Sequence, residues 1–448
     1  MSSSSSSFSL HFPSDFRWGT ATAAHQVEGN NIHNQWWVWE QTAGSIEGGD
    51  TSGPACNWWE DAEADFDRMV ELNLNAHRLS VEWSRIEPTE GRFDNDALQR
   101  YHDMLLGLRK RGIEPMVTLH HFTNPSWLEE GGGWTNAEYV LPRFRRFVER
   151  TVRALSDVCD FWCTINEPNV FAVMTYMGGR MPPAPAPDFG RTLRVFCNLV
   201  AAHVQAAAVI RDIQPRARVG IAHHMRVFQG LRPNHALDAI AARAQDTLFN
   251  QAILSSLLNG RWHWALRRFA PAVRLSRGTL DWIGLNYYTR QATRFRRDQA
   301  ATGFGSIENF PGVAMSDYEY GEIYPAGLLK MLQRLSRSKL PLYITENGLP
   351  DHDDDQRPGF LIAHLREVWK AIQFCYDVRG YYHWSFVDNF EWSEGWRMKF
   401  GLYSLDPLTQ LRELRRSGAL YGEIARTGSI TDDMVRRYAP QLMETVFK

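Results

Sequence analysis

Short apolar runs recur along the chain, and each is followed by a longer segment in which apolar residues return every three or four positions. The first pattern is typical of strands buried on both faces, and the second is typical of amphipathic helices. The apolar runs cover residues 18–26, 75–83, 113–121, 160–167, 217–224, 281–288, 341–346 and 380–386. Eight strands that alternate with helices predict an α/β chain folded as a (β/α)8 TIM barrel.

Three of the intervening segments are long amphipathic helices, predicted over residues 96–112, 136–155 and 360–375. Asn136 is a suitable N-cap for the second helix, and Gly112 is a suitable C-cap for the first. A doubly wound open sheet is the alternative fold, but it normally carries a G-x-G-x-x-G turn after an early strand, and no such turn is present in this sequence. The barrel is therefore the preferred prediction.

One polar, glycine-containing segment, residues 292–320, is long for a loop. We interpret it as a functional insertion over one face of the barrel. Residues 8–448 are expected to form one catalytic barrel domain. Residues 1–7, Met1 followed by six serines, lack the basic and apolar regions of a signal peptide and are predicted to be a disordered tail.

Composition narrows the classes of function. The 448 residues include 49 Lys and Arg against 51 Asp and Glu, a net charge of −2, which argues against a nucleic-acid or anionic-membrane partner. We find no apolar run of transmembrane length.

The five cysteines are scattered without metal-ligand spacing and are interpreted as buried thiols of a reducing compartment. The expected location is therefore cytoplasmic, and no metal is expected. The 17 Trp exceed the 15 Tyr, and although most indoles belong in the core, flat amphipathic rings also suit sugar faces.

The ends of the predicted strands are unusually polar. Asn166-Glu167-Pro168 ends the fourth strand, and proline is expected to hold Glu167 extended, so that no helix begins directly there; a solvated turn is the alternative reading. The complete set of strand-end residues is Gln26, Arg78 with Glu82, His120-His121, Asn166-Glu167, His223-His224, Asn286-Tyr287-Tyr288, Glu346-Asn347 and Trp384. Because active sites of such barrels lie at the carboxyl ends of the strands, these side chains are the candidate site.

Two carboxylates, Glu167 and Glu346, end strands four and seven, which face each other across the barrel mouth. Paired carboxylates are the machinery of glycoside hydrolysis: a spacing of roughly 5–5.5 Å gives retention, and a wider gap admits water and gives inversion. Arg78 is a cation that would keep a neighbouring carboxylate ionised, or else a structural ion-pair partner. His120 and His121 point to opposite faces of a strand, so one inward histidine that binds a hydroxyl is the better reading than a metal site.

Six motifs together resemble glycoside hydrolase family 1, the retaining β-glucosidases and β-galactosidases, from Phe8 onwards. They are FRWGTATAAHQVEG (16–29), RLSVEWSRIEP (78–88), CTINEP (163–168), IGLNYY (283–288), YITENG (343–348) and WSFVDNFEW (384–392). The resemblance implies hydrolysis of terminal β-glycosyl residues from small glycosides or short oligosaccharides. It implies a covalent glycosyl-enzyme intermediate and no cofactor.

Residue by residue, the resemblance implies that Glu167 is the general acid/base and Glu346 the nucleophile. Asn166 would bind the sugar 2-hydroxyl, Arg78 and Tyr288 would orient Glu346, and Asn286 would support the same shell. The implied hydroxyl-binding residues are Gln26, His121, Glu391 and Trp392, with Trp384 as the stacking floor.

The chain departs from the family pattern at few positions. Phe122 replaces a frequent Trp after the strand-three histidine, and His25 replaces a frequent Tyr. A 6-phospho-β-glycosidase is the first alternative, but Glu391 is a carboxylate that would repel a phosphate, and Met398 and Phe400 stand where such enzymes carry Lys and Tyr. The thioglucosidase branch carries Gln at the acid/base position, which does not match Glu167.

Two further readings stay open. A non-catalytic sugar-binding homologue would be expected to lose one of the two glutamates, and both are present. Transglycosylation would depend on loops near 292–320 and 350–358. The acidic stretch 351–357 is interpreted as an ordinary solvated loop in preference to a rim that repels anionic aglycones. The sugar preferred among glucose, galactose and fucose is not specified by the motifs, nor is the oligomeric state.

Overall fold

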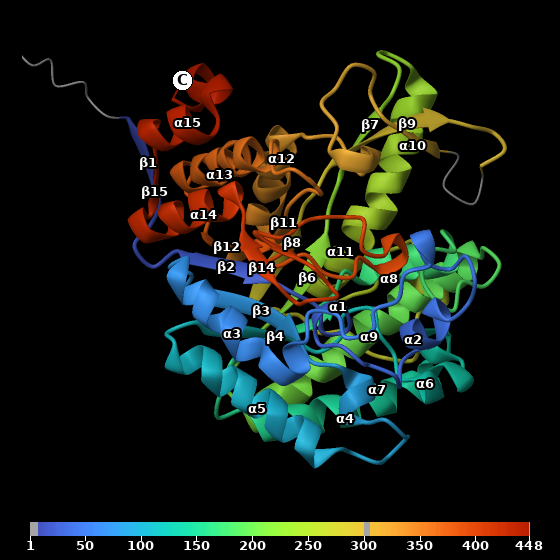
Figure 1. Cartoon of the computed structure of the whole chain (residues 1–448). Coiled ribbons are helices and arrows are strands. Elements are labelled where there is room, and N and C mark those ends of the chain that lie inside the picture. Colours follow the sequence, from blue (N-terminus) through green and yellow to red (C-terminus); the bar gives the residue numbers. More distant parts are fainter. Residues whose placement is uncertain (1–7, 300–304, 448) are drawn as a thin grey trace, which may run out of the picture.

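Eight parallel strands close into a barrel in the computed structural model, which describes residues 8–299 and 305–447 (Figure 1). In chain order they are β2 (Arg17–Ala21), β3 (Ala76–Ser80), β4 (Glu114–Thr118), β5 (Phe161–Asn166), β6 (Arg218–His224), β8 (Trp282–Asn286), β11 (Leu342–Asn347) and β12 (Val378–Trp384). The last strand pairs with the first, so the sheet has no open edge. The predicted (β/α)8 fold is confirmed, whereas the predicted tail, residues 1–7, lies outside the described residues.

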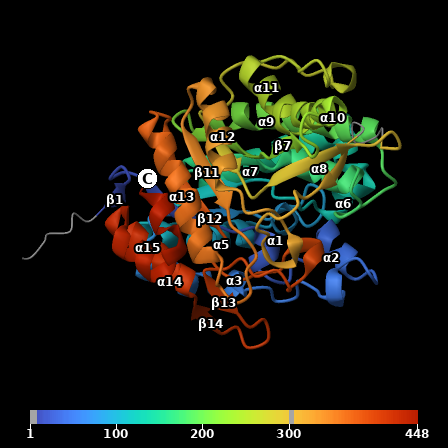
Figure 2. The same ribbon diagram turned by 90° about the horizontal axis from the view of Figure 1, so that it is seen from above.

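A helix follows each barrel strand and covers the outside of the barrel (Figure 2). These helices are α3 (Trp58–Glu71), α5 (Asn95–Lys110), α7 (Ala137–Leu155), α9 (Phe189–Ile213), α11 (Ala252–Asn259), α12 (Pro325–Leu335), α13 (Arg357–Gln373) and α14 (Arg416–Thr427). The Asn136 side chain accepts a hydrogen bond from the Tyr139 backbone N–H and caps α7 as predicted. Gly112 has φ 74°, the left-handed conformation expected just after α5.

Shorter elements decorate the loops between strands and helices. The helices are α1 (Ala24–Val27), α2 (Gln35–Glu40), α4 (Trp83–Ile86), α6 (Ser126–Glu130), α8 (Pro168–Tyr176), α10 (Ala236–Asp246), α15 (Asp432–Tyr438) and α16 (Met443–Val446). The additional strands are β1 (Ser9–His11), β7 (Val227–Gly230), β9 (Arg290–Phe295), β10 (Gly305–Glu308), β13 (Tyr403–Leu405), β14 (Arg412–Leu414) and β15 (Ser429–Thr431). β1 pairs with β15, which joins the two ends of the described chain (Figure 1).

The segment predicted as a loop insertion, 292–320, contains regular structure. It supplies most of β9 and all of β10, which pair with each other, and β9 also pairs with β7 in a three-stranded sheet beside α10 (Figure 1). Residues 300–304 of this segment lie outside the described part of the chain. The sheet and α10 therefore form a lobe that rises beside the fifth and sixth barrel strands.

Helix α9 corrects one prediction from the sequence. It is long and apolar enough to cross a membrane by length and composition, although the sequence was read as having no such run. Most of its apolar stretch is buried inside the protein, where it packs against α7 and α8. An apolar helix of this kind is typical of the core of a large barrel.

The cysteines also differ in part from the prediction. Cys56, Cys159, Cys163 and Cys197 are buried free thiols as expected, but Cys375 is exposed. Its φ of 59° places it in the left-handed turn that follows α13, and turns of this kind lie at the surface.

Candidate active site

Glu167 stands at the junction of β5 and α8, in a conformation that the sequence did not predict. Its φ of 43° and ψ of 56° are left-handed, not extended, and α8 begins at once with Pro168. The Glu167 N–H donates to the Ala222 carbonyl in β6, and its own carbonyl accepts the first helical hydrogen bond, from Phe171. These two bonds offset a backbone strain of about 1–2 kcal/mol, so one residue both completes the strand and starts the helix.

The strands that carry the two candidate carboxylates change register just before them. The pairing of β5 with β6 shifts between Cys163 and Asn166, and the pairing of β11 with β8 shifts between Ile344 and Glu346. Register shifts of this kind re-aim side chains at the rim of a barrel. They explain how residues next to each other in sequence, Asn166 and Glu167, both contribute to one hydrogen-bonded network.

Glu346 is held by two donors. The Arg78 guanidinium donates to Oε1 at 2.7 Å, and the Tyr288 hydroxyl donates to Oε2 at 2.7 Å. Arg78 is completely buried and Glu346 is 4% exposed, so the ion pair is shielded from water. The predicted contacts of Arg78 and Tyr288 with Glu346 are therefore present.

A network of amides connects Glu346 to Glu167. The second terminal nitrogen of Arg78 donates to Asn166 Oδ1 at 2.6 Å. The Asn286 amide donates to Asn166 Oδ1 at 3.1 Å and to Glu167 Oε1 at 2.8 Å. Asn286 was expected to support the shell around Glu346; its amide joins that shell through Asn166, the acceptor of Arg78, and also contacts Glu167 directly.

His224, one of the strand-end candidates, and Arg226, which was not a candidate, lie behind Glu167. His224 Nδ1 is 2.8 Å from Glu167 Oε1, and the Arg226 Nε–H donates to His224 Nε2 at 2.9 Å. Since Nε2 accepts, the ring proton is on Nδ1, and His224 donates to Glu167. Burial lowers the pKa of His224, so the ring is neutral near pH 7. His224 was on the strand-end list, but the sequence offered no signal for its pairing with Arg226.

A second group of polar side chains lies toward β2 and β12. The Gln26 amide donates to Glu391 Oε2 at 3.1 Å and to Asn389 Oδ1 at 2.9 Å. The Asn166 amide donates to His121 Nε2 at 3.0 Å, which leaves the ring proton on His121 Nδ1. Within the described part of the chain, Gln26 Oε1 and His121 Nδ1 are buried without a hydrogen-bond partner. A buried acceptor and a buried donor without partners indicate a site for a polar ligand.

Aromatic rings line the same region. The Trp392 ring lies 6.0 Å from His121 and 5.3 Å from Phe122, and the Trp384 ring lies 5.9 Å from His121. Phe122 fills the position where a Trp was considered, with its carbonyl bonded to the Gln35 amide. The predicted rings are thus gathered around His121.

Phe400 and Met398, the two positions weighed for phosphate binding, are buried. The Phe400 ring packs edge-on against Tyr288 and Tyr320, with centroids 6.3 and 5.3 Å apart. Both side chains are apolar, so neither provides a donor for a phosphate.

The two carboxyls influence each other electrostatically. Burial, opposed by the Arg78 guanidinium and increased by repulsion from Glu167, raises the pKa of Glu346 to about 7. At Glu167, burial raises the pKa, but His224 and the Asn286 amide outweigh it, so the pKa of Glu167 lies below its ordinary value. A pair that interacts in this way takes up its protons in steps that belong to both groups. Burial also raises the pKa of Glu391, to about 8.

Comparisons with known proteins agree with this geometry. The family model described as "Glycosyl hydrolase family 1" matches residues 8–429. The curated "Beta-glucosidase A" of Thermotoga maritima is 30% identical, over 94% of this chain and 99% of its own. The curated "Beta-galactosidase" of Saccharolobus solfataricus is also 30% identical, over 94% and 96%.

Solved structures give the same result. The "beta-glycosidase from Pyrococcus horikoshii" is 36% identical with a TM-score of 0.88, over 96% of this chain and 98% of that one. The Thermotoga maritima β-glucosidase in complex with deoxynojirimycin is 28% identical with a TM-score of 0.87, over 94% and 99%.

The chain belongs to glycosyl hydrolase family 1. It is a hydrolase of O-glycosyl bonds, and retention of anomeric configuration is general to family 1. The roles of the individual side chains stay predictions. The structure brings each predicted residue of the family 1 site into contact with another member of that set, Phe400 with Tyr288.

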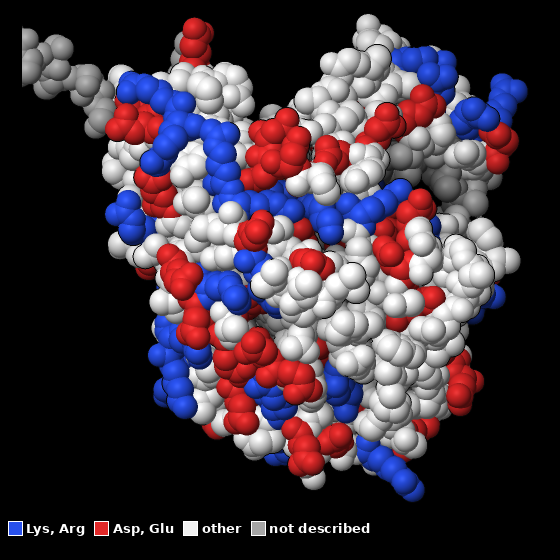
Figure 3. Space-filling model, viewed as in Figure 1, with Lys and Arg blue, Asp and Glu red and all other residues white. Residues whose placement is uncertain are grey.

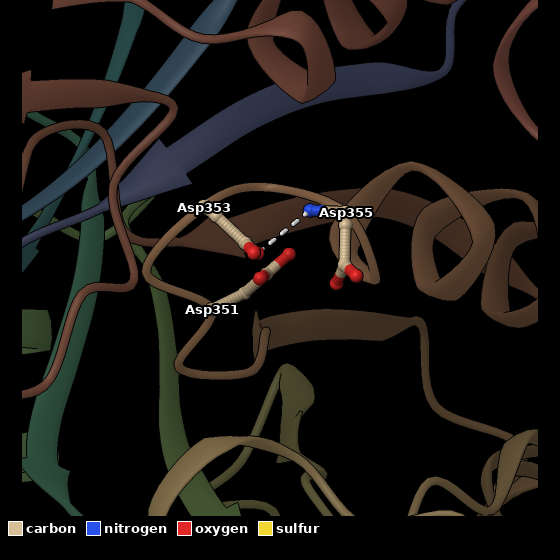
Figure 4. Close-up of side chains that lie close together, drawn as sticks. All are labelled: Asp351, Asp353 and Asp355. Atoms are coloured by element: carbon tan, nitrogen blue, oxygen red, sulfur yellow. Dashed lines mark hydrogen bonds between the residues drawn. The ribbon is translucent and has the colours of Figure 1, made fainter.

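Away from the family 1 site, one acidic group among the described residues is close enough to hold a metal ion: Asp351, Asp353 and Asp355 (Figure 4). Asp351 Oδ2 accepts from the backbone N–H groups of Gln356 and Arg357, at 3.0 and 2.7 Å, and so caps the start of α13. This capping gives the buried Asp351 a structural role, and Asp353 and Asp355 are exposed. The absence of a metal stays a prediction.

The reading of 351–357 as an ordinary solvated loop is wrong in part. Asp351, Asp354 and Arg357 are buried, and Arg357 forms an ion pair with Asp354. The Asp354 carboxylate also accepts from Ser417 at the start of α14. The stretch therefore ties two barrel helices together.

Charges of both signs are interspersed over the face shown in Figure 3, and the upper edge of this face is notched between the lobe of the C-terminal helices and the lobe of α10 and β9. This mixture agrees with the near-neutral net charge of the chain.

Proposed function

We propose that the chain hydrolyses terminal β-D-glucosides by double displacement, with Glu346 as nucleophile and Glu167 as general acid/base. The observation that carries the proposal is the difference between their partners. Glu346 is bonded to the guanidinium of Arg78 and to a hydroxyl, whereas Glu167 is bonded to a neutral imidazole and an amide.

The single proton of the carboxyl pair is assigned by these partners. Arg78 keeps its charge at every accessible pH and stabilises an ionised Glu346. His224 is neutral because burial lowers its pKa, so it supplies a hydrogen bond to Glu167 but no charge. With Glu346 ionised, like-charge repulsion favours the proton on Glu167.

In the first step, Glu346 attacks the anomeric carbon while Glu167 protonates the departing oxygen. Glu167 Oε1 already accepts from His224 and Asn286, so the transferable proton is on Oε2. The negative charge of Glu346 disappears as the ester bond to the sugar forms. Asn166, fixed by Arg78 and Asn286, is placed to bind the sugar 2-hydroxyl, a contact that strengthens in the transition state.

In the second step, Glu167 acts as a base. Once Glu346 is an uncharged ester, the repulsion that favoured a protonated Glu167 is gone, and the pKa of Glu167 falls. The ionised Glu167 then takes a proton from water as that water attacks the anomeric carbon. Both displacements invert the configuration, so the net result is retention.

We assign sugar recognition to the polar side chains that lie toward β2 and β12: Gln26, His121 and Glu391. Gln26 Oε1 is an acceptor, His121 Nδ1–H is a donor, and Glu391 binds hydroxyls between them, with Trp384 beneath the ring. Glu391, Met398 and Phe400 give no support to a 6-phosphorylated substrate, because none of the three supplies a cation and the last two lack donors. Galactose and fucose differ from glucose in hydroxyl orientation and remain the alternative sugars.

Four buried thiols agree with a proposed cytoplasmic location.

The test is hydrolysis of p-nitrophenyl β-D-glucoside by the wild type, by Glu346→Gly, and by Glu167→Ala with added azide. Turnover by the wild type, its loss in Glu346→Gly, and β-glucosyl azide from Glu167→Ala are the expected results. An α-glucosyl azide would contradict the assigned roles. No turnover of β-glucosides by the wild type, with turnover of 6-phosphoglucosides, would replace the proposal by the phospho-glycosidase reading.

A further inference from the structure

His25 is a buried histidine beside the sugar-binding residues, and the proposed mechanism gives it no role. It directly precedes Gln26 in α1 and is 1% exposed. Its ring lies nearly parallel to that of Trp392, with an angle of 16° between the planes and centroids 6.0 Å apart. Trp392 is one of the residues expected to bind a sugar hydroxyl. A residue that stacks on such a side chain can influence recognition without contacting the sugar.

Polar neighbours at both ring nitrogens fix the orientation of the His25 ring. Asn34 Oδ1 accepts from the Trp37 backbone N–H at the start of α2, so the amide nitrogen of Asn34 is the group that faces His25 Nδ1, at 3.1 Å. Since Nδ1 accepts, the ring proton is on Nε2, which lies 3.9 Å from Glu40 Oε2. Burial lowers the pKa of His25 to about 3, so the ring is neutral in neutral solution. Ser52 in turn holds the Glu40 carboxyl with two hydrogen bonds.

The placement of Trp392 depends on the rings around it. Its φ of 51° is left-handed, a conformation that a bulky residue adopts only where the surrounding structure enforces it. The rings of Trp36, Phe122 and His121 lie 4.8, 5.3 and 6.0 Å from the indole. The two rings closest to parallel with it are His25 and His121, at 16° and 24°. Removal of the His25 ring would therefore free one face of the packing that holds the indole in its plane.

We propose that His25 is a positioning residue for sugar recognition: its ring fixes the plane of the Trp392 indole, and through it the hydrogen bond that the indole Nε1–H donates to a sugar hydroxyl. The inference rests on the proposed function, because the indole has this role only if a sugar is bound there. Within the described part of the chain, Trp392 forms no hydrogen bond with Glu167 or Glu346. Loss of an interaction that binds substrate and transition state equally raises KM and leaves kcat unchanged, so the effect is expected mainly in KM.

The test compares His25→Ala, His25→Gln and His25→Phe in hydrolysis of p-nitrophenyl β-D-glucoside. Ala and Gln both remove the flat ring, and each should raise KM about fivefold, the effect of one hydrogen bond, with kcat within about twofold of the wild type. Phe restores a ring that can stack, so its KM should return to within about twofold of the wild type, although loss of the contact with Asn34 should lower its melting temperature. His364→Ala is the matched control, because His364 is a fully buried histidine of α13 that packs on Phe360 outside the site. It should lower the melting temperature and leave KM unchanged.

A double-variant cycle tests whether His25 acts through Trp392. Trp392→Phe removes the indole donor and should by itself raise KM about fivefold. In this background His25→Ala should change KM by less than about twofold, because the hydrogen bond that His25 positions is already gone.

Three results would overturn the inference: an unchanged KM in His25→Ala and His25→Gln, a KM in His25→Phe as high as in His25→Ala, or rises that multiply in the double variant. Turnover of the glucoside by the wild type would in each case leave the proposed function standing. No turnover of any glycoside by the wild type would overturn both.

Discussion

One terminal nitrogen of Arg78 donates to Glu346 at 2.7 Å, and the other donates to Asn166 at 2.6 Å. A single buried guanidinium thus fixes the carboxylate assigned as nucleophile and the amide assigned to the 2-hydroxyl. The planar fork of arginine makes this possible, because its donors point to two acceptors at a fixed spacing.

Arg78→Lys should break this relationship while retaining a positive charge. An ammonium on a flexible stem does not reproduce both contacts, so the attacking carboxylate loses its fixed position. We expect kcat for a β-glucoside to fall by about 10²-fold, the cost of a misplacement of about 1 Å. Arg100→Lys is the matched control, since Arg100 makes a paired contact with Glu63 outside the site. A fall of equal size in the control would show a general effect on folding.

The carboxyl pair should dominate the pH dependence. Burial and repulsion from Glu167 raise the pKa of Glu346 to about 7, so the pair loses its proton as pH rises through this value. Activity requires that proton for the leaving group, and kcat/KM is therefore expected to fall above about pH 7. In Glu346→Gln the repulsion is absent, and the remaining carboxyl of Glu167 should titrate at lower pH than it does beside Glu346. Carbon-13 NMR of labelled glutamate measures the titration of Glu167 in the wild type and in Glu346→Gln. An unchanged titration of Glu167 in the variant would refute the coupling.

The barrel and most of the site follow from local sequence signals. Each buried strand is a short apolar run, and Asn136 and Gly112 mark helix ends by their own side-chain and backbone preferences. The motifs CTINEP and YITENG are also local signals, and they placed Glu167 and Glu346 at the ends of strands. Such signals do not depend on which strands become neighbours.

Contacts between distant segments were not predictable in this way. The Asn286 amide reaches Glu167 from β8, and this contact depends on the pairing of β8 with β6 and of β6 with β5. Glu167 is left-handed because it bonds both to β6 and to α8, which overrides the local effect of Pro168. The burial of Asp354 depends on Arg357 and Ser417, the latter 63 residues away in sequence.

His224 should set the pKa of Glu167 through one hydrogen bond. Its Nδ1–H stabilises the ionised carboxylate, so His224→Leu should raise the pKa of Glu167 and move the alkaline limb of kcat/KM to higher pH, while kcat falls because the carboxyl is less well oriented. His224→Asn supplies an amide donor and should restore part of the profile. His120→Leu is the control, since His120 bonds to Asn124 and not to Glu167. A loss of thermal stability without a shift of the limb would show a purely structural role.

Glu391 should determine which sugar is accepted. Its carboxyl accepts from the Gln26 amide, beside the unpaired Gln26 Oε1, so Glu391→Ala removes a hydroxyl partner while the Gln26 amide keeps its bond to Asn389. Loss of hydrogen bonds to a carboxylate should lower kcat/KM for p-nitrophenyl β-D-glucoside by roughly 10- to 100-fold. The ratio of glucoside to galactoside should also move toward one, because the discriminating group is gone. An unchanged ratio would place sugar discrimination elsewhere.

The Arg357–Asp354 ion pair should be a major contribution to stability outside the site. Both side chains are buried, and Asp354 also binds Ser417, so Arg357→Met leaves a buried carboxylate without its cation. Removal of one member of a buried pair costs about 3–5 kcal/mol of the free energy of unfolding. Arg366→Met, at a half-buried arginine of α13, is the matched control. Denaturant unfolding measures the difference between the two variants.

The double variant Arg357→Met/Asp354→Asn distinguishes a charge effect from a loss of packing. With both charges removed, Asp354 no longer leaves an unpaired carboxylate in the interior, and the double variant should be less destabilised than the sum of the two single variants. Additive losses would mean that the two residues stabilise the junction of α13 and α14 independently. In either case kcat/KM for glucosides should change little at temperatures where the variants are folded, because Arg357 makes its contacts with Asp351, Asp354, Ser417 and the Lys399 carbonyl, all outside the carboxyl network.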